Sequence, residues 1–194
     1  MKVALIPCAA TDWTQDGRLL GRVDLEPGED AHGQCKKWSE TLRDQKLARI
    51  YHAPDILSKT TAQSIAQALN IPAKNLEALA EVDLGLWAGL TEGELKKRFA
   101  KAHRQLIDSP MNVRPPNGED FSDASARLRN CLKKQIKPNG RASIGLVMRP
   151  FSFAMACYLL QGDSVKIWEA SQDQPAPRVM ECFGVPEAAN NDET

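Results

Sequence analysis

The stretch Leu5-Ile6-Pro7-Cys8-Ala9-Ala10-Thr11-Asp12-Trp13 decides the fold. It starts inside a short apolar run, Val3 to Ile6, and continues into a polar loop that contains glycine. An apolar run of this length that ends in such a loop predicts a buried β-strand. We therefore expect a first strand whose carboxyl end carries Pro7 and Cys8.

Strands and helices are predicted to alternate along the rest of the chain. We expect helices at about 30–47, 58–69, 91–107, 121–137 and 152–160, and strands at 49–52, 144–148, 165–168 and 178–183. This alternation predicts an α/β fold, a three-layer sandwich with helices on both faces of a mainly parallel sheet. Sites in such folds gather at the carboxyl ends of the strands. We expect one domain over residues 1–186 and a polar, disordered tail over 187–194.

Two helix starts have recognisable capping signals. Thr91-Glu92-Gly93-Glu94 has the pattern of a capping box. Ser58 or Thr60 is the expected cap of the helix at 58–69.

The charge and cysteine content of the chain narrows the possible partners and compartments. The 194 residues include 25 basic and 25 acidic ones, so neither nucleic acid nor an anionic membrane is expected as a partner. The five cysteines are scattered and show no C-x-x-C spacing, which predicts reduced thiols in the cytoplasm and neither a metal nor a cofactor. No apolar run approaches the ~20 residues of a membrane span.

Several separated segments resemble, in order, one known family. They include Thr11-Asp12-Trp13 followed by Gly17-Arg18, the segment Glu81-Val82-Asp83-Leu84-Gly85-Leu86-Trp87-Ala88-Gly89-Leu90-Thr91, and Pro116-Asn117-Gly118-Glu119-Asp120-Phe121. Together they resemble the histidine phosphatase (phosphoglycerate mutase-like) superfamily over roughly residues 3 to 160. Matches in several ordered segments are far more specific than one short motif.

The resemblance implies a particular chemistry and shows where this chain departs from it. In the family, one histidine attacks the phosphoryl group, two arginines and a second histidine hold it, and a glutamate protonates the leaving oxygen. The first arginine aligns with Pro7, the nucleophile with Cys8, a loop asparagine with Thr14, the second arginine with Leu57 and the second histidine with Arg149. Only the acid position, Glu81, keeps its residue type.

Cys8 has two interpretations. It is a thiolate nucleophile, as in cysteine phosphatases, or a small buried apolar side chain at the end of a strand. Cysteine phosphatases need an arginine six positions on, and here that position is Thr14. We favour the buried side chain.

Arg149 also has two interpretations. It binds an anion, or it forms an internal ion pair with Glu81, because a buried charge needs a partner. We favour the ion pair, in which Glu81 is a structural partner. Arg18 is a further candidate for anion binding at the rim of the pocket.

The function predicted from these losses is a catalytically inactive pseudoenzyme that acts as a binding or regulatory scaffold. Removal of one preorganised donor costs about 10²–10³ in rate, and here several positions differ together. Two alternatives stay open: a weak or altered phosphatase or phosphomutase that acts on a small phosphorylated substrate, and an interaction subunit with a filled pocket. The partner is an unknown protein or a small anionic ligand.

Overall fold

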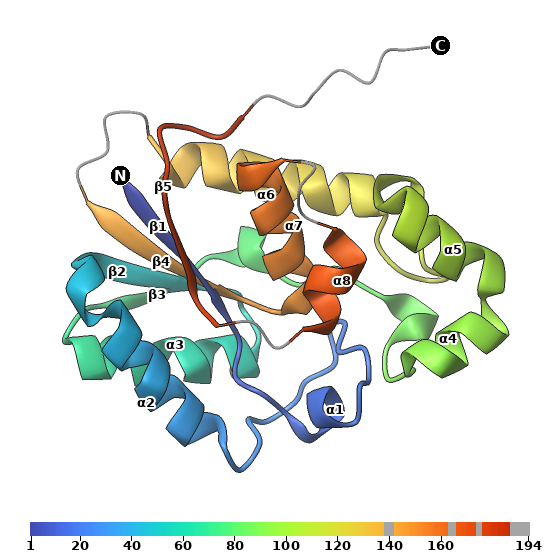
Figure 1. Cartoon of the computed structure of the whole chain (residues 1–194), viewed down its shortest axis with the longest axis horizontal. Coiled ribbons are helices and arrows are strands. Elements are labelled where there is room, and N and C mark those ends of the chain that lie inside the picture. Colours follow the sequence, from blue (N-terminus) through green and yellow to red (C-terminus); the bar gives the residue numbers. More distant parts are fainter. Residues whose placement is uncertain (138–141, 163–165, 174–175, 187–194) are drawn as a thin grey trace.

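The central feature of the computed structural model is one sheet, built from β1 (Lys2–Pro7), β2 (Leu47–His52), β3 (Ala73–Asn75), β4 (Ser143–Met148) and β5 (Arg178–Glu181). The structure describes residues 1–137, 142–162, 166–173 and 176–186. The strand order is β3-β2-β4-β1-β5 (Figure 1). All neighbouring strands are parallel except β5, which pairs antiparallel with β1. The predicted α/β fold with a mainly parallel sheet is confirmed.

The first strand is buried on both faces, as its unbroken apolar sequence predicts. Val3 and Leu5 pack into one hydrophobic cluster, and Ala4 and Ile6 pack into a second cluster on the opposite face. Because successive side chains of a strand point to opposite faces, β1 serves both halves of the core. The strand pairs with β4 up to Pro7 and Met148, so both strands end at the same edge of the sheet.

Helices cover both faces of the sheet (Figure 1). One face carries α2 (Ala31–Leu42) and α3 (Ile56–Leu69), which pack against each other. The other face carries α6 (Phe121–Gln135), α7 (Pro150–Gln161) and α8 (Ile167–Gln172). Three further α-helices lie outside these layers, namely α1 (Asp12–Gln15), α4 (Glu92–Arg98) and α5 (Ala100–Asp108).

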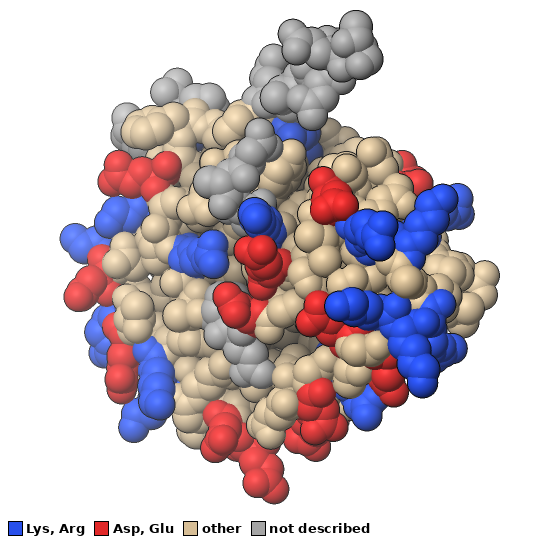
Figure 2. All heavy atoms as spheres, turned by 45° about the vertical axis from the view of Figure 1, so that its right-hand side comes forward, with Lys and Arg blue, Asp and Glu red and all other residues tan. Residues whose placement is uncertain are grey.

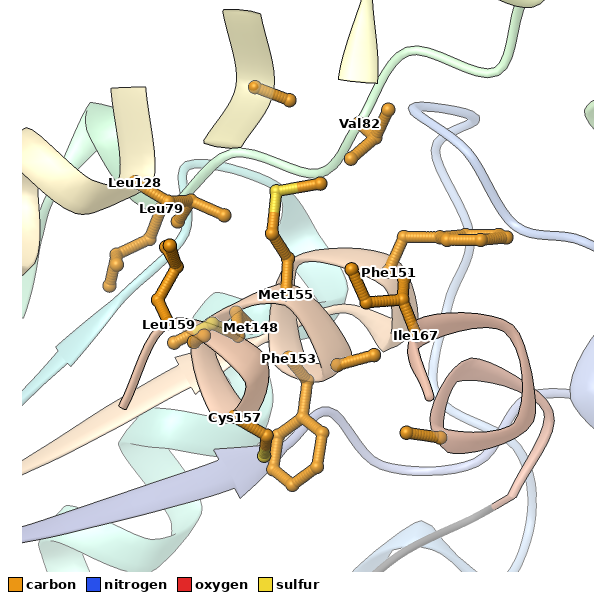
Figure 3. Close-up of a cluster of buried hydrophobic side chains, with 14 of the residues drawn as sticks. Leu79, Val82, Leu128, Met148, Phe151, Phe153, Met155, Cys157, Leu159 and Ile167 are labelled. Atoms are coloured by element: carbon orange, nitrogen blue, oxygen red, sulfur yellow. The ribbon is translucent and has the colours of Figure 1, made fainter. Parts of the chain in front are cut away.

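The larger half of the core is built around α7. Figure 3 shows Phe151, Phe153 and Met155 of this helix among Leu79, Leu128 and other apolar side chains. The α7 side chains from Phe151 to Cys157 are all buried. A helix with so little exposed surface needs neighbours on every side, and here β1, β4, α6 and α8 supply them.

Three local predictions are wrong for identifiable reasons. The helix expected over 91–107 is two helices, because Phe99 leaves the helical conformation and stacks at 6.2 Å from the Trp87 ring. The strand expected at 165–168 is the start of α8 where it is described, because Trp168 packs edge-on against His103. The cap of α3 is Asp55, neither Ser58 nor Thr60, because the helix begins at Ile56.

Several other local predictions hold. The Thr91 capping box is present, with both of its hydrogen bonds. The remaining predicted helices and strands are found with ends shifted by a few residues. The short strand β3 and helix α1 were not predicted, and the predicted tail at 187–194 lies outside the described residues.

The surface carries both signs of charge, unevenly distributed. Figure 2 shows basic and acidic side chains interspersed over most of one face, with a denser basic group at one side. Helices α4 and α5 carry a run of exposed basic residues, namely Lys96, Lys97, Arg98, Lys101 and Arg104. Among the described helices, none is long and apolar enough to cross a membrane.

Gly85 is the position where the fold most strictly requires glycine. Its φ is +47°, and a Cβ there would lie 2.1 Å from the Pro116 carbonyl oxygen. Gly85→Ala should lower the free energy of unfolding by about 3 kcal/mol or more, from the clash plus the left-handed backbone. Urea unfolding followed by circular dichroism measures this loss.

Gly93→Ala is the matched control. Gly93 lies inside α4, and a Cβ there meets nothing within 4 Å. Alanine should stabilise this helix by about 0.5–1 kcal/mol. Equal effects of the two substitutions would contradict the assignment of Gly85 as a constrained position.

Candidate functional site

A cleft lies at the carboxyl edge of the sheet, where β1 and β4 end. Its volume of about 50 Å³ has room for a few water-sized groups. The cleft is lined by Pro7, Cys8, Ala9, Ala10, Thr14, Gly17, Arg18, Leu19, Leu20, Gln34, Glu81, Pro150, Phe151, Phe153, Ser171, Gln172 and Asp173. A cleft in this position is where an α/β fold is expected to bind its ligand.

Cys8 lies at the base of this cleft, one residue past the end of β1. Its backbone N–H donates to the Met148 carbonyl at 3.0 Å, so the β1–β4 pairing fixes its place. The side chain packs with Leu20 and Leu57 in a small apolar cluster. Burial raises the pKa of the Cys8 thiol far above its ordinary value, although the nearby Arg149 charge opposes this shift. The thiol is therefore neutral at physiological pH and a poor nucleophile.

Glu81 is a buried acid in the wall of the cleft. Its carboxylate accepts hydrogen bonds from the backbone N–H groups of Phe151 (3.0 Å), Ser152 (2.7 Å) and Val82 (2.8 Å). Burial raises the pKa of the Glu81 carboxyl, and the three backbone donors oppose this shift. A carboxyl in such a place can hold a proton that it later gives to a substrate.

Polar groups of the first loop and of α2 form another part of the wall. Gln34 accepts from the Ala10 N–H through Oε1, and its Nε2 makes no hydrogen bond to any described residue. Thr14 closes the first turn of α1 by its bonds with Thr11. Arg18 donates to the Gly89 carbonyl and lies 3.7 Å from both Asp16 and Glu94. Its side chain is 37% exposed, and it is the one cation among the described residues of the cleft.

Arg149 does not pair with Glu81, so the predicted ion pair is wrong. The guanidinium is fully buried and donates through Nε to Asp55 Oδ1 at 2.9 Å. Its Nη1 donates to the carbonyls of Gly21 (2.8 Å) and Val23 (2.7 Å). The physical reason is that Glu81 already has three backbone donors, whereas Asp55 Oδ1 accepts only the Ser58 N–H at the start of α3 besides the arginine.

The predicted site residues therefore divide into two groups. Pro7, Cys8, Thr14, Glu81 and Arg18 line the cleft together. Leu57 and Arg149 do not line it: Leu57 is packed beneath Cys8, and Arg149 is directed to the first loop.

Two features of the site were missed at the level of sequence. Asp55 was not considered as the partner of Arg149, although a carboxylate that follows a proline ahead of a predicted helix is a capping signal. The wall formed by Ser171, Gln172 and Asp173 had no signal, because contact across a fold leaves no local pattern.

The sheet topology defines an α/β protein with a cleft at its strand ends, and comparison with known proteins gives the family. Residues 4–183 match the family model of the histidine phosphatase superfamily (branch 1). The chain therefore belongs to this superfamily.

Three named relatives are similar to this chain over different shares of its length. Phosphoserine phosphatase 1 of Hydrogenobacter thermophilus is 26% identical over 181 residues, which are 93% of this chain and 86% of that protein. The bifunctional protein Rv2228c of Mycobacterium tuberculosis is 32% identical over 129 residues, 66% of this chain and 35% of that protein. A probable phosphoglycerate mutase of Serratia proteamaculans is 23% identical over 69% of this chain and 62% of that protein.

Solved structures agree with the fold. Bacillus stearothermophilus YhfR superposes with a TM-score of 0.79 at 19% identity, over 100% of this chain and 98% of its own. The mycobacterial glucosyl-3-phosphoglycerate phosphatase Rv2419c superposes with a TM-score of 0.73 at 21% identity, over 87% of this chain and 83% of its own.

The prediction of a catalytically inactive pseudoenzyme is contradicted by these comparisons. One relative, which matches nearly the whole chain, is named as a phosphatase, and another is named as a probable mutase. The filled pocket of the interaction-subunit alternative is not found either, because Cys8 and Glu81 line a cleft. Replacement of the family's histidine nucleophile does not by itself exclude phosphatase activity.

Removal of the buried Arg149 charge should strongly destabilise the fold. Arg149→Met leaves the Asp55 carboxylate and two loop carbonyls without their donor, which should cost about 3–5 kcal/mol of unfolding free energy. The double variant Arg149→Met/Asp55→Asn should lose less than the sum of the two single variants. Additive losses in urea unfolding would show that the two side chains do not interact.

Proposed function

We propose that this protein hydrolyses a small phosphomonoester in the cleft, by an altered route that does not use the family's histidine. The observation that carries the proposal is Glu81, a carboxyl of raised pKa that faces the same cleft as the strand-end residue Cys8. Full-length similarity to a phosphoserine phosphatase supports the reaction class. Phosphoserine is therefore the first substrate to assay.

Water is the nucleophile in the proposed route. Its oxygen attacks phosphorus as the bond between phosphorus and the ester oxygen breaks, and the Glu81 carboxyl gives its proton to the departing alcohol oxygen. A proton of the attacking water then returns to the Glu81 carboxylate, so the enzyme ends as it began. Phosphoryl transfer has a loose transition state with little bonding to the nucleophile, so its catalysis depends mainly on positioning and on charge stabilisation.

In this proposal, the substrate phosphate is held by one neutral donor and one cation. Arg18 offers its charge, and Gln34 Nε2 offers an N–H that is uncommitted among the described residues. Arg149 is not part of this cradle, because it does not line the cleft and its Nε and Nη1 donate to Asp55 and two carbonyls.

The rate should be low. A typical enzyme turns over about 10 times per second, and loss of one preorganised donor costs about 10²–10³. We expect a kcat on the order of 10⁻² s⁻¹ or below.

We also propose a cytoplasmic location and a small anionic ligand, the phosphomonoester itself, as partner. The five cysteines are free and buried, which suits a reducing compartment.

Glu81→Gln should reduce kcat for phosphoserine by about 10²–10⁴, because glutamine cannot donate the proton. In the wild type, the rate should fall as pH rises through the pKa of Glu81, which lies above its ordinary value of 4.5. This limb should be absent in Glu81→Gln. Released phosphate, measured across pH, checks both effects.

Two controls accompany the Glu81 variant. Glu40→Gln changes an exposed carboxylate on α2 and should leave the rate unchanged. Cys8→Ser should also change it less than threefold; a complete loss in Cys8→Ser would instead establish a covalent cysteine route and contradict attack by water. Wild-type phosphate release no faster than that of Glu81→Gln would overturn the proposed function.

Arg18→Gln should raise KM by about tenfold with little change in kcat, because a charge-assisted contact to the substrate phosphate is lost in the ground and transition states alike. Arg43→Gln is the comparison, since Arg43 is exposed and lies outside the cleft. Steady-state kinetics with phosphoserine gives both parameters. Equal KM values for wild type and Arg18→Gln would remove Arg18 from the cradle.

A further inference from the structure

A second cavity lies beside the cleft and is lined by Arg22, Asp24, Pro54, Asp55, Ala80, Glu81 and Arg149. Its volume of about 240 Å³ exceeds that of the cleft and has space for a small organic molecule. Among the described residues, Glu81 is the one that lines both spaces. The proposed reaction leaves this second cavity without a role.

The wall of the second cavity carries a cation, Arg22, which is ion-paired with Glu119, and an exposed anion, Asp24. Arg22 uses Nε for the Glu81 carbonyl and Nη2 for Glu119, while its Nη1 makes no hydrogen bond to a described residue. Asp24 is exposed and has no hydrogen bond or ion pair within the described part of the chain. Arg22 Nη1 and the Asp24 carboxylate, two residues apart in the first loop, are thus available to a ligand.

Beneath these two residues lies a buried pair with one unused atom on each side. Arg149 is fully buried, and its Nη2 has no hydrogen-bond partner. Oδ2 of Asp55 is likewise buried and without a partner. Unpaired buried groups are costly, so a ligand that reaches them gains more than it would from exposed groups. Both atoms are covered, although the two residues line the cavity.

The mixture of charges decides which ligand fits. A simple anion would face the carboxyl groups of Asp24, Asp55 and Glu81, and a simple cation would face Arg22 and Arg149. No group of His, Cys, Asp or Glu among the residues described could hold a metal ion. A small molecule that carries an ammonium and a carboxylate close together would satisfy both signs.

We propose that this cavity binds a free α-amino acid. Its carboxylate pairs with Arg22 and reaches towards Arg149 Nη2, and its ammonium pairs with Asp24 and reaches towards Asp55 Oδ2. This proposal does not rest on the proposed phosphatase activity, because binding requires no phosphate ester.

Isothermal titration calorimetry of the full chain at pH 7 tests this site, with L-serine and glycine as probes. Saturable binding is expected for both amino acids and absent for acetate or methylammonium at the same concentration. Asp24→Asn should weaken binding by about tenfold or more, since one charge-assisted contact is lost. Asp16→Asn, an exposed carboxylate of the same loop outside the cavity, is the matched control and should bind as the wild type does.

Three outcomes would overturn the proposal. They are no saturable binding of either amino acid, equal binding of acetate, and an unchanged dissociation constant in Asp24→Asn. Loss of binding in Arg18→Gln would also overturn it, because that result would place the amino acid in the cleft. Phosphatase activity is assayed separately, so a failure of either proposal is distinguishable from a failure of the other.

Discussion

The buried guanidinium of Arg149 is the constraint on which the functional edge of this molecule depends. It ties together three parts of the chain that are far apart in sequence: the end of β4, the start of α3 through Asp55, and the first loop through the Gly21 and Val23 carbonyls. A buried charge cannot remain unpaired, so once arginine stands at this position the loop and the helix start must converge on it. The loop that forms one wall of the cleft is thereby fixed to the sheet.

The same constraint shapes the chemistry. In families that handle phosphate, positive charge normally faces the anion. Here the buried guanidinium of Arg149 is paired with Asp55 and stabilises the fold instead. The cleft keeps a protonatable acid, Glu81, held in place by backbone donors at the start of α7. It also keeps the partly exposed Arg18 at its rim. An acid with a weak cradle accounts for a slow phosphomonoesterase better than for an efficient one.

Much of the fold could be predicted from sequence because the signals are local. The apolar run at Val3 to Ile6 specifies a strand buried on both faces, and the Thr91 capping box specifies a helix start. The prediction failed where tertiary contacts override local pattern. Phe99, which packs against Trp87, separates two helices, and Trp168, which packs against His103, lies in a helix. Both contacts join residues that are distant in sequence, so no local pattern predicts them.

The site shows the same division. Cys8, Thr14, Arg18 and Glu81, which the family segments indicate, lie around one cleft in the structure. The predicted partner of Arg149 was wrong, because two carboxylates lie in the same region. Only the three-dimensional arrangement shows that Glu81 already accepts three backbone hydrogen bonds. The prediction of inactivity was wrong for a different reason: the residues that differ at the family's positions do not by themselves exclude activity, and a relative that matches nearly the whole chain is named as a phosphatase.

The most direct test of the central claim is a crystal structure of the protein with orthovanadate, which mimics the phosphoryl group during transfer. Our account predicts vanadate in the cleft, contacted by Arg18 and Gln34 and within hydrogen-bond distance of Glu81, with Arg149 still paired to Asp55. Vanadate bound to the Arg149 guanidinium, or an empty cleft at saturating vanadate, would contradict it.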